Sequence, residues 1–440
     1  MVVSFLLVVA ACTGTADPDT TEDTSTPEGT EAPDSTDAET PSTEAPSDGE
    51  PVEITIWFAR DYIPPDDFQS LLAEHNVDVT YDVRPGDDML PTMLQMREAG
   101  ESLPCMIEDD SHWVPAYIES GLIQPMTEYI ATFEEEDPDL YGTVLPSTWS
   151  EGTYDGEIYH AAWTSAYDLI YYDIEKLETA GVEVPFETWN DVLEAARLVK
   201  EAFPETEHVF GTGGTSHDPL FYWLTNFGVP FDGNIPDLTS EQGLEFIAWA
   251  QALRNEELIN PDYVIGENDE SQGAWIGGNG AILQDGVNAG LDYMAAPDWD
   301  YGEDWLSTPM PNNEGGAQMN VPRGWSITAE CEHPYEASLA LRYLMDPENA
   351  LPRYMLASST PRSTAVLESP EVAEAQPYFV GPVIEAFLSV DRQLPPGTNT
   401  LQVGDVLLDL RDELLVTGTE EAPEDIAARY QPLLDELQQG

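Results

Sequence analysis

The residues of this sequence that could do chemistry are aromatic rings set close to carboxylates and amides, a combination suited to binding a ligand. Flat rings stack on apolar faces, and carboxylate and amide oxygens accept hydrogen bonds. Aromatic residues are densest in 157–173, EIYHAAWTSAYDLIYYD, where Trp163 and Tyr167 lie an even number of residues apart. In an unbroken strand both side chains point to the same side, so we expect both to face a cleft.

The stretch 157–173 is predicted to be a strand that crosses between two lobes. Aromatic and β-branched residues favour strands, and Asp-Gly at 155–156 and Tyr-Asp at 172–173 mark the two ends. A helix is the alternative, because the aromatic residues at 159, 163 and 167 recur every four positions.

The sequence contains no recognised catalytic or metal-binding motif. Gly-x-Ser-x-Gly, HExxH, P-loop and EF-hand patterns are absent, and Gly-Thr-Gly-Gly at 211–214 is typical of a turn after a strand. A glycosidase needs two carboxylates about 5–9.5 Å apart, but 85 Asp and Glu residues make such pairs common by chance. We therefore expect no metal and no cofactor, and keep a secreted glycoside-acting enzyme as an alternative.

The charge balance is strongly acidic, with 14 Lys and Arg against 85 Asp and Glu and a net charge of −71. Such a field repels nucleic acids and anionic lipid surfaces, so we expect neither as a partner. It suits saline water, where salt screens self-repulsion, and so indicates halophilic adaptation. It also makes a cationic ligand, such as a polyamine or a peptide, an alternative to a neutral one.

The N-terminal 50 residues differ in composition from the rest. Residues 1–12 are an apolar run too short to cross a bilayer, and Val-Ala-Ala-Cys at 9–12 resembles the lipobox of bacterial lipoproteins, which predicts Cys12 as a lipid anchor. No Lys or Arg precedes this run, so we expect translation to start upstream of Met1. Residues 13–50 are acidic and rich in Thr and Pro, which predicts a disordered tether.

From Pro51 the sequence alternates between strands and helices. Strands are expected at 52–58, 77–83 and 104–107, each followed by a helical segment, which is the pattern of an open, mostly parallel sheet. Ligands bind at the carboxyl ends of such strands. This position is occupied by the candidate residues Trp57 and Phe58 after the first strand, and Asp110, His112 and Trp113 after the third.

The order of several segments resembles the extracellular solute-binding proteins of ATP-driven importers, especially the sugar-binding branch. The resemblance covers roughly 52–440 and is carried by MLQMREAGESLPCMI, YIESGLIQP, the crossing stretch, PFETWND and WIGGNGAILQDG, which begin at 93, 117, 159, 185 and 275. Cys105 stands where the family usually has Asp. Whether Cys105 and Cys331 are paired or free cannot be read from these residues.

The resemblance implies a type II periplasmic-binding-protein-like α/β fold, with two mixed, mostly parallel sheets flanked by helices and joined by hinge crossings. It predicts lobe one at 51–160 plus 276–327 and lobe two at 166–272 plus 333–440. Ligand binding would then select a closed arrangement of the two lobes.

The same resemblance implies a monomeric protein on the outer face of the cytoplasmic membrane that captures a carbohydrate, an oligosaccharide in particular, and delivers it to a permease. A sugar needs rings for its C–H faces and carboxylates or amides for its hydroxyls. Besides the residues above, this makes Trp223, Asn226, Asp285 and Trp325 candidates for ligand contact. Arg323 and Arg362 are expected either to hold an anionic ligand group or to pair with acidic neighbours.

Overall fold

The structure is a computed structural model that describes residues 51–59, 72–73, 75–212, 218–265, 268–357, 360–390, 392–393 and 395–438. The predicted signal peptide with Cys12 and the predicted tether at 13–50 lie outside these residues. Within them, no helix combines the length and apolar character that crossing a bilayer requires.

The first sheet has seven strands in the order β14-β6-β13-β3-β1-β2, with β15 added alongside β13. The N-terminal strands β1, β2 and β3 are parallel, whereas β13 runs antiparallel to both β3 and β6. The bounds are β1 Val52–Phe58, β2 Val77–Val83, β3 Met106–Asp110, β6 Ala161–Ala166, β13 Met319–Ile327, β14 Thr360–Pro361 and β15 Arg392–Gln393.

The second sheet has four strands in the order β12-β7-β11-β8. Its members are β7 Asp168–Asp173, β8 His208–Thr212, β11 Gly280–Gly286 and β12 Trp305–Pro309. β8 and β11 are parallel, and β7 is antiparallel to both of its neighbours. Every residue of β7 is buried, as expected for a central strand covered on both faces. Two small hairpins complete the strands: β4 Thr153–Tyr154 with β5 Glu157–Ile158, and β9 Phe231–Asp232 with β10 Ile235–Pro236.

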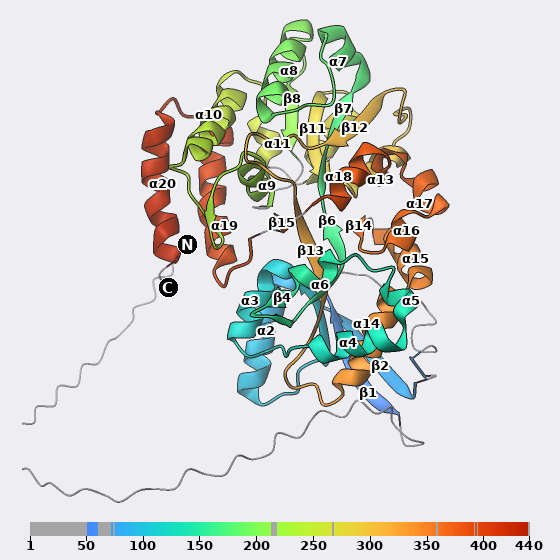
Figure 1. The fold of residues 1–440 in the computed structure, drawn as a ribbon. Helices are drawn as coiled ribbons and strands as arrows, with labels where there is room; N and C mark the ends of the chain where they lie inside the picture. The colour runs from blue at the N-terminus through green and yellow to red at the C-terminus, as the bar shows by residue number, and fades with distance from the viewer. Residues whose placement is uncertain are drawn as a thin grey trace, which may run out of the picture. The chain divides into compact units, whose positions relative to one another are not determined.

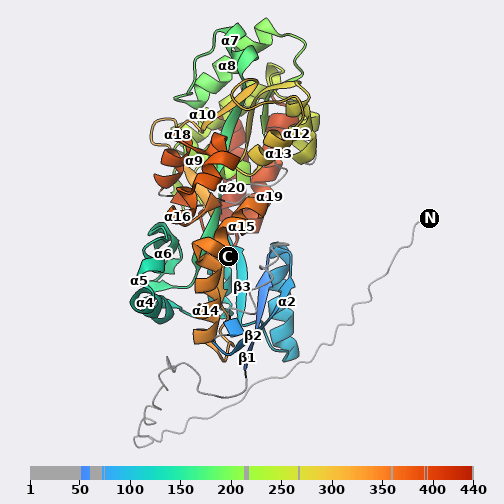
Figure 2. The same ribbon diagram turned by 90° about the vertical axis from the view of Figure 1, so that its right-hand side faces the viewer.

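Helices cover the sheets and bury their apolar faces. In the first sheet α2 and α14 lie on opposite faces (Figure 2), with Met89 and Met93 packed near Trp57, and Leu341 and Leu344 packed near Ile54. The helices before the first crossing are α2 Gly86–Ala99, η1 Ser111–Trp113, α3 Val114–Glu119, α4 Thr127–Glu136, α5 Pro138–Tyr141 and α6 Ser147–Glu151. Those between β7 and β13 are α7 Ile174–Ala180, α8 Trp189–Ala202, α9 Asp218–Asn226, α10 Glu241–Asn255, α11 Pro261–Ile265, α12 Asn268–Ile276 and α13 Ala289–Ala295.

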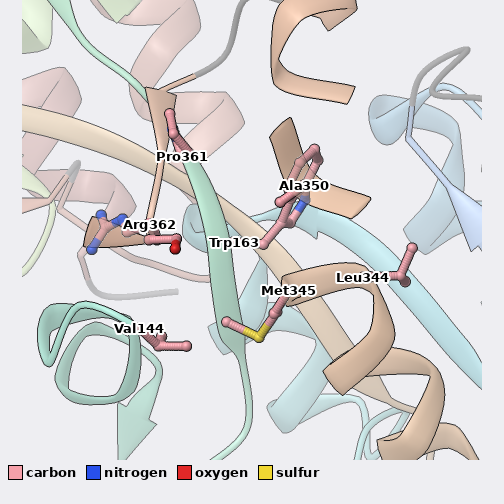
Figure 3. Close-up of a pocket in the computed structure, with 8 residues that line it drawn as sticks. Val144, Trp163, Leu344, Met345, Ala350, Pro361 and Arg362 are labelled. Atoms are coloured by element: carbon pink, nitrogen blue, oxygen red, sulfur yellow. The ribbon is translucent and has the colours of Figure 1, made fainter. Parts of the chain in front are cut away.

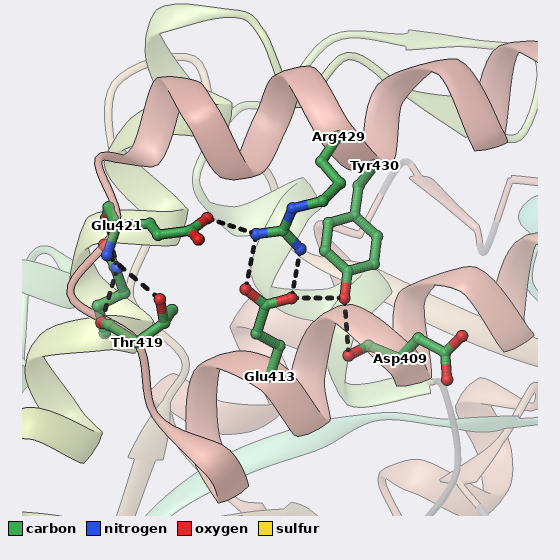
Figure 4. A network of polar contacts seen from close by, with 7 residues as sticks. Asp409, Glu413, Thr419, Glu421, Arg429 and Tyr430 are labelled. Atoms are coloured by element: carbon green, nitrogen blue, oxygen red, sulfur yellow. Dashed lines mark hydrogen bonds and ion pairs between the residues drawn. The ribbon is translucent and has the colours of Figure 1, made fainter.

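The C-terminal part of the chain is helical. It comprises α14 Pro334–Met345, α15 Pro347–Ala357, α16 Thr364–Leu367, α17 Pro370–Ala375, η2 Pro377–Phe379, α18 Pro382–Leu388, α19 Thr400–Arg411, η3 Asp412–Thr417 and α20 Pro423–Leu437. An exposed network ties α20 to η3, in which Arg429 pairs with Glu413 and Glu421 at 2.6 and 2.7 Å (Figure 4). Tyr430 adds a hydrogen bond of 2.8 Å to Glu413.

The predicted crossing strand is confirmed, and the helix alternative is wrong. Residues 161–166 form β6 in the first sheet and residues 168–173 form β7 in the second, so only Tyr167 separates the two sheets along the chain (Figure 1). The strand is not unbroken, because the chain changes sheet at Tyr167 and β6 carries an irregularity at Trp163.

The expected assignment of 276–327 to lobe one is wrong for β11 and β12, which pair with β7 in the second sheet. The assignment of 333–345 to lobe two is also wrong, because α14 packs on the core of the first sheet. Both errors have the same cause. The local pattern predicts a strand or a helix, but which sheet the element joins is set by the side chains that it buries. Leu283 of β11, for example, packs with Trp275, Tyr293 and Trp305 in the core of the second sheet.

Cys105 and Cys331 form a disulfide with their Cα atoms 4.5 Å apart. It connects the segment that enters β3 with the turn that follows β13, across 226 residues of sequence. The backbone already joins the two segments, since the Thr328 N–H donates to the Cys105 carbonyl at 3.0 Å. The sequence left this pairing open, and the fold decides it.

Candidate functional site

The carboxyl edges of both sheets face the crossing at Tyr167. In the first sheet β1, β3 and β6 run in the same direction, and β6 ends at Ala166. In the second sheet β8 and β11 end where the antiparallel β7 begins, since Gly286 pairs with Asp168. Open α/β sheets bind ligands outside the carboxyl ends of their strands. The side chains at these two edges therefore make up the candidate site.

Trp163 lies in a β-bulge at the first of these edges. Arg323 pairs with Thr164 and the next residue, Gly324, pairs with Ala162, so the register between β6 and β13 shifts at Trp163. A bulge redirects a side chain and is common beside functional sites. Gly324 makes this possible: a Cβ there would lie 2.2 Å from the Ala161 carbonyl oxygen, too close for any other residue.

The indole of Trp163 is held on two sides. Its Nε1–H donates to Glu108 Oε1 at 2.7 Å, and Glu108 Oε2 accepts from the Ala59 N–H at 3.2 Å. The guanidinium carbon of Arg353 lies 4.3 Å from the centre of the ring. The ring is therefore fixed by a hydrogen bond at its edge and by a cation–π contact on its face, and Glu108 is itself held by the backbone at the end of β1.

Glu108 is fully buried, and burial raises the pKa of its carboxyl group. Arg323 and Arg353, together with the hydrogen bonds from Trp163 and Ala59, oppose this shift by stabilising the charged form. The carboxylate therefore connects β1, β3, β6 and α15 in one buried network. Neither Glu108 nor Arg353 was predicted. The sequence signal for Glu108 was its place in Glu-Asp-Asp at the end of β3, whereas Arg353 lies on a distant helix without any local signal.

The two following carboxylates have different partners. Asp110 pairs with Arg323 Nη2 at 2.7 Å, so the expectation that Arg323 pairs with an acidic neighbour is confirmed. Asp109 accepts from the Tyr117 hydroxyl at 2.5 Å and from the Asp110 N–H at 2.8 Å. Burial, and then the charge of Asp110, raise the pKa of Asp109 well above its usual range.

Arg362 is buried beside β6 and links it to α6. Its guanidinium donates to Ser165 Oγ and Ser147 Oγ at 2.8 Å each and lies 2.5 Å from a carboxylate oxygen of Glu151. Between Arg362 and Trp163 lies a cavity of about 10 Å³, the size of one water molecule (Figure 3). In this conformation Trp163 is therefore enclosed on this side.

The second edge carries carboxylates and amides from β7 and β11. Gln284 Nε2 donates to Asp168 at 2.9 Å, and Asp285 accepts from Gln272 at 2.9 Å and from the Tyr293 hydroxyl at 2.6 Å. Burial raises the pKa of Asp285. Both edges of the site thus present more carboxylates than basic groups.

The structure brings part of the predicted set together. Asp110, Trp163 and the neighbouring His112 and Trp113 of η1 lie at the first edge, and Asp285 lies at the second. Tyr167 is buried between them and donates to Gln318 at 3.2 Å.

The other predicted residues lie in hydrophobic cores. Phe58 and Trp325 pack edge to face at 5.0 Å under the first sheet, and Trp57 packs with Trp113. Trp223 is fully buried among the aromatic residues of the second lobe.

Asn226 forms hydrogen bonds with the segment that connects β12 to β13. Its amide nitrogen donates to Asn312 Oδ1 at 3.0 Å and to the Ala317 carbonyl at 2.9 Å. It therefore supports the second crossing from within the fold. Ligand contact by any residue of the predicted set stays a prediction.

The chain resembles known proteins in sequence model and in fold. Residues 63–351 match the model of the bacterial extracellular solute-binding proteins. No curated protein matches the chain. Similar solved structures include an ABC substrate-binding protein from Listeria monocytogenes in complex with cycloalternan (TM-score 0.69, 17% identity, 89% of this chain and 100% of that one). They also include a cyclic α-maltosyl-1,6-maltose binding protein from Arthrobacter globiformis, with the same TM-score, identity and coverage.

A third similar structure is a maltose-bound protein from T. maritima (TM-score 0.66, 18% identity, 88% of this chain and 100% of that one). At such identities the likeness concerns the fold. It confirms the predicted α/β architecture of two sheets joined by crossing strands.

Proposed function

This chain belongs to the bacterial extracellular solute-binding proteins, and from that premise we propose that it captures a carbohydrate outside the cell. The ligand is an oligosaccharide, which the protein delivers to the membrane permease of an ATP-driven importer. Proteins of similar fold are described as complexes with cycloalternan, with maltose and with maltotetraose.

The observation that carries the proposal is the meeting of the two carboxyl edges at Tyr167. A sugar hydroxyl donates to a carboxylate, and the site offers Asp110 on one edge with Asp168 and Asp285 on the other. The C–H face of a pyranose stacks on an aromatic ring, and Trp163 is a ring fixed by Glu108 that becomes open to a sugar when the Arg353 guanidinium over it moves aside. A ring held in place before binding loses less conformational entropy when the ligand arrives.

Binding by hinge closure follows from the same arrangement. The two edges belong to different sheets, so a ligand that contacts both is bound more tightly in one arrangement of the lobes than in others. A ligand shifts a conformational equilibrium only by this difference in affinity. Bending at Tyr167 and at the β12–β13 connection is the expected motion.

The finer parts of the proposal concern the surroundings of the protein. Cys12 carries a lipid that anchors a monomer to the outer face of the cytoplasmic membrane, and residues 13–50 hold the folded part away from the lipid surface. Support comes from the sequence at 9–12 and from the composition of 13–50. Incorporation of labelled palmitate into the wild-type protein, and its loss in Cys12→Ala, tests the anchor.

A cationic ligand is the second candidate. The carboxylates at the two edges, Asp110, Asp168 and Asp285, favour a polyamine or a cationic peptide over an anion. A glycoside-acting enzyme is a further alternative, although the chain belongs to a family of binding proteins.

A thermal-shift screen tests these alternatives together. Ligand at about 1,000 times its Kd stabilises the folded state by about 4 kcal/mol, which raises the melting temperature measurably. The proposal expects a shift with one or more oligosaccharides, none with spermidine, and unchanged sugar by chromatography after hours of incubation. A shift with spermidine alone contradicts the carbohydrate proposal, and consumption of the sugar supports the enzyme alternative.

A further inference from the structure

A groove of about 440 Å³ lies on the helical layer of the first sheet, outside the candidate site described above. Its walls come from α14, through Tyr335, Leu339 and Arg342, and from the end of α4, through Glu136 and Asp137. Sites for small molecules span about 300–1,000 Å³ and combine apolar walls with a few polar groups. The groove therefore has the size and the mixed lining of a ligand site.

Arg342 is the buried cation of this groove. Its side chain is only 10% exposed, and its Nη1 pairs with Glu136 at 2.6 Å. Among the described residues, its Nε and Nη2 have no hydrogen-bond partner, but both atoms are buried from solvent, and the guanidinium carbon lies 5.2 Å from the centre of the Phe133 ring. Buried donors without partners are rare and costly in folded proteins. Nη1, the donor that Glu136 uses, is therefore the one that a bound carboxylate meets first, and a guanidinium that turns toward this carboxylate can add a second, parallel hydrogen bond.

Glu136, the acidic partner of Arg342, is much more exposed to solvent than Arg342 itself. Its side chain is 45% exposed, against 10% for Arg342, and the Tyr335 hydroxyl contacts the same carboxylate oxygen at 3.4 Å. A half-exposed side chain at the end of a helix has room to rotate into solvent, but the buried Arg342 then needs another carboxylate in its place. The carboxylate of a bound molecule can then take the place of Glu136 on Arg342.

Two further carboxylates line the groove and favour an ammonium group. Asp137 uses one oxygen to cap α5, accepting from the Leu140 N–H at 3.2 Å, and Asp346 accepts from the Glu348 N–H at 2.8 Å. Each cap uses one of the two carboxylate oxygens, so the other oxygen of each group can accept from a ligand in the groove. A ligand with only a carboxylate is repelled by these charges, and a ligand with only an amine leaves the donors of Arg342 unused.

We propose that this groove binds a small zwitterion, namely an α-amino acid with an apolar side chain. Its carboxylate pairs with Arg342, its ammonium group faces Asp137 and Asp346, and its side chain packs on Leu339 and Tyr335. The site is separate from the carbohydrate site, so the two ligands bind to the protein at the same time.

Calorimetric titration of the full chain with three probes tests the ligand class. The probes are L-leucine, 4-methylpentanoate, which lacks the amine, and isoamylamine, which lacks the carboxylate. Leucine is expected to bind, and each analogue to bind at least about ten-fold more weakly, the ratio produced by a loss of about 1.4 kcal/mol. Absence of leucine binding, or equal binding of an analogue, overturns the proposal.

Two variants and a matched control locate the site. Arg342→Met is expected to abolish leucine binding, and Glu136→Gln is expected to tighten it several-fold, because the competing carboxylate is removed. Glu413→Gln removes the acid of another Arg–Glu pair of the same length, 2.6 Å, and should leave leucine affinity unchanged. If Arg342→Met does not fold, the tighter leucine binding expected of Glu136→Gln still tests whether the groove is the site. Unchanged affinity in Glu136→Gln overturns the proposal, whatever the response to sugars.

Discussion

At the scale of single residues, the site depends on Trp163, whose environment differs from that of the other predicted aromatic residues. Phe58, Trp223 and Trp325 lie in hydrophobic cores, and so does Trp163, but Trp163 also donates a hydrogen bond to Glu108 and has a guanidinium over its ring. A polar handle of this kind fixes the ring in one orientation. It is therefore the residue at which binding and stability can be separated by substitution.

Replacing Trp163 should lower the stability of the protein and weaken sugar binding, and Trp163→Ala should do both more strongly than Trp163→Phe. Trp163→Phe keeps a ring but leaves Glu108 Oε1 without the indole donor, at a cost of about 1–3 kcal/mol in the free energy of unfolding. Trp163→Ala also leaves a cavity and should cost about 3–5 kcal/mol. Urea unfolding measures both values. Equal stability of Trp163→Phe and the wild type would show that the hydrogen bond to Glu108 contributes nothing.

Asp109 should make stability depend on pH. Because its pKa is raised by folding, the native state keeps a proton that the unfolded state loses above about pH 4. The free energy of unfolding therefore falls as pH rises from about 4 to the raised pKa, and is constant beyond it. Asp109→Asn removes this contribution.

Urea unfolding at a series of pH values gives the free energy of unfolding of the wild type and of Asp109→Asn. As pH rises through this window, the free energy of unfolding of the wild type should fall relative to that of the variant. A difference that is independent of pH contradicts the assignment. Since the variant keeps an acceptor for the Tyr117 hydroxyl, loss of that hydrogen bond cannot account for the trend.

At the scale of elements, the β-bulge in β6 depends on a glycine in the neighbouring strand. In Gly324→Ala the new Cβ would lie 2.2 Å from the Ala161 carbonyl oxygen and 2.5 Å from the Ala162 Cα, and backbone atoms cannot move away cheaply. We expect a loss of about 4 kcal/mol or more in unfolding free energy, which is large for one substitution.

Gly273 provides the control for this substitution. It lies within α12, and a Cβ there meets nothing within 4 Å. Gly273→Ala should stabilise the protein by up to about 1 kcal/mol, because alanine favours helix. Equal effects of the two substitutions in urea unfolding would show that the close approach at Gly324 is unimportant.

The disulfide joins two elements of the first sheet that are distant in sequence. Removing a native disulfide typically costs about 2–5 kcal/mol, mainly because the unfolded chain gains freedom. The double variant Cys105→Ala/Cys331→Ala should lose an amount in this range in urea unfolding. Reduction of the wild type by dithiothreitol should have the same effect, and no effect on the double variant. If reduction leaves the wild type unchanged, the bond does not stabilise the fold.

The sequence predicts elements better than it predicts their partners. Alternation and aromatic density were sufficient for β1, β2 and the crossing at 157–173, because these signals are local. The placement of β11, β12 and α14 was wrong because strand pairing depends on contacts such as Ile282 with Tyr172, which no local pattern contains. For the same reason the sequence offers Asp110 and Trp163 as candidates, whereas Arg353, which lies over the Trp163 ring, has no local signal.

At the scale of the whole molecule, charge is the dominant property. Every Lys and Arg side chain that the structure describes contacts a carboxylate, a backbone carbonyl or an aromatic ring. With 14 basic and 85 acidic residues, carboxylates far outnumber basic groups in this chain. Their mutual repulsion opposes the compact state at low ionic strength.

Salt should stabilise this protein. The screening length falls from about 10 Å at 0.1 M to about 3 Å at 1 M, so repulsion between neighbouring carboxylates weakens. The melting temperature should rise with NaCl over this range, and KCl should have the same effect because screening depends on ionic strength. A melting temperature that falls with salt would mean that the few ion pairs outweigh the repulsion.

The central claim is that the two carboxyl edges at Tyr167 hold a carbohydrate around Trp163. Calorimetric titration of malto-oligosaccharides into the wild type, Trp163→Phe and Trp163→Ala tests it most directly, with folding of each variant checked by circular dichroism. We predict saturable binding to the wild type, weaker binding to the folded Phe variant and none to the Ala variant. Sugar binding of equal affinity in all three proteins, or absent from the wild type, would contradict the account.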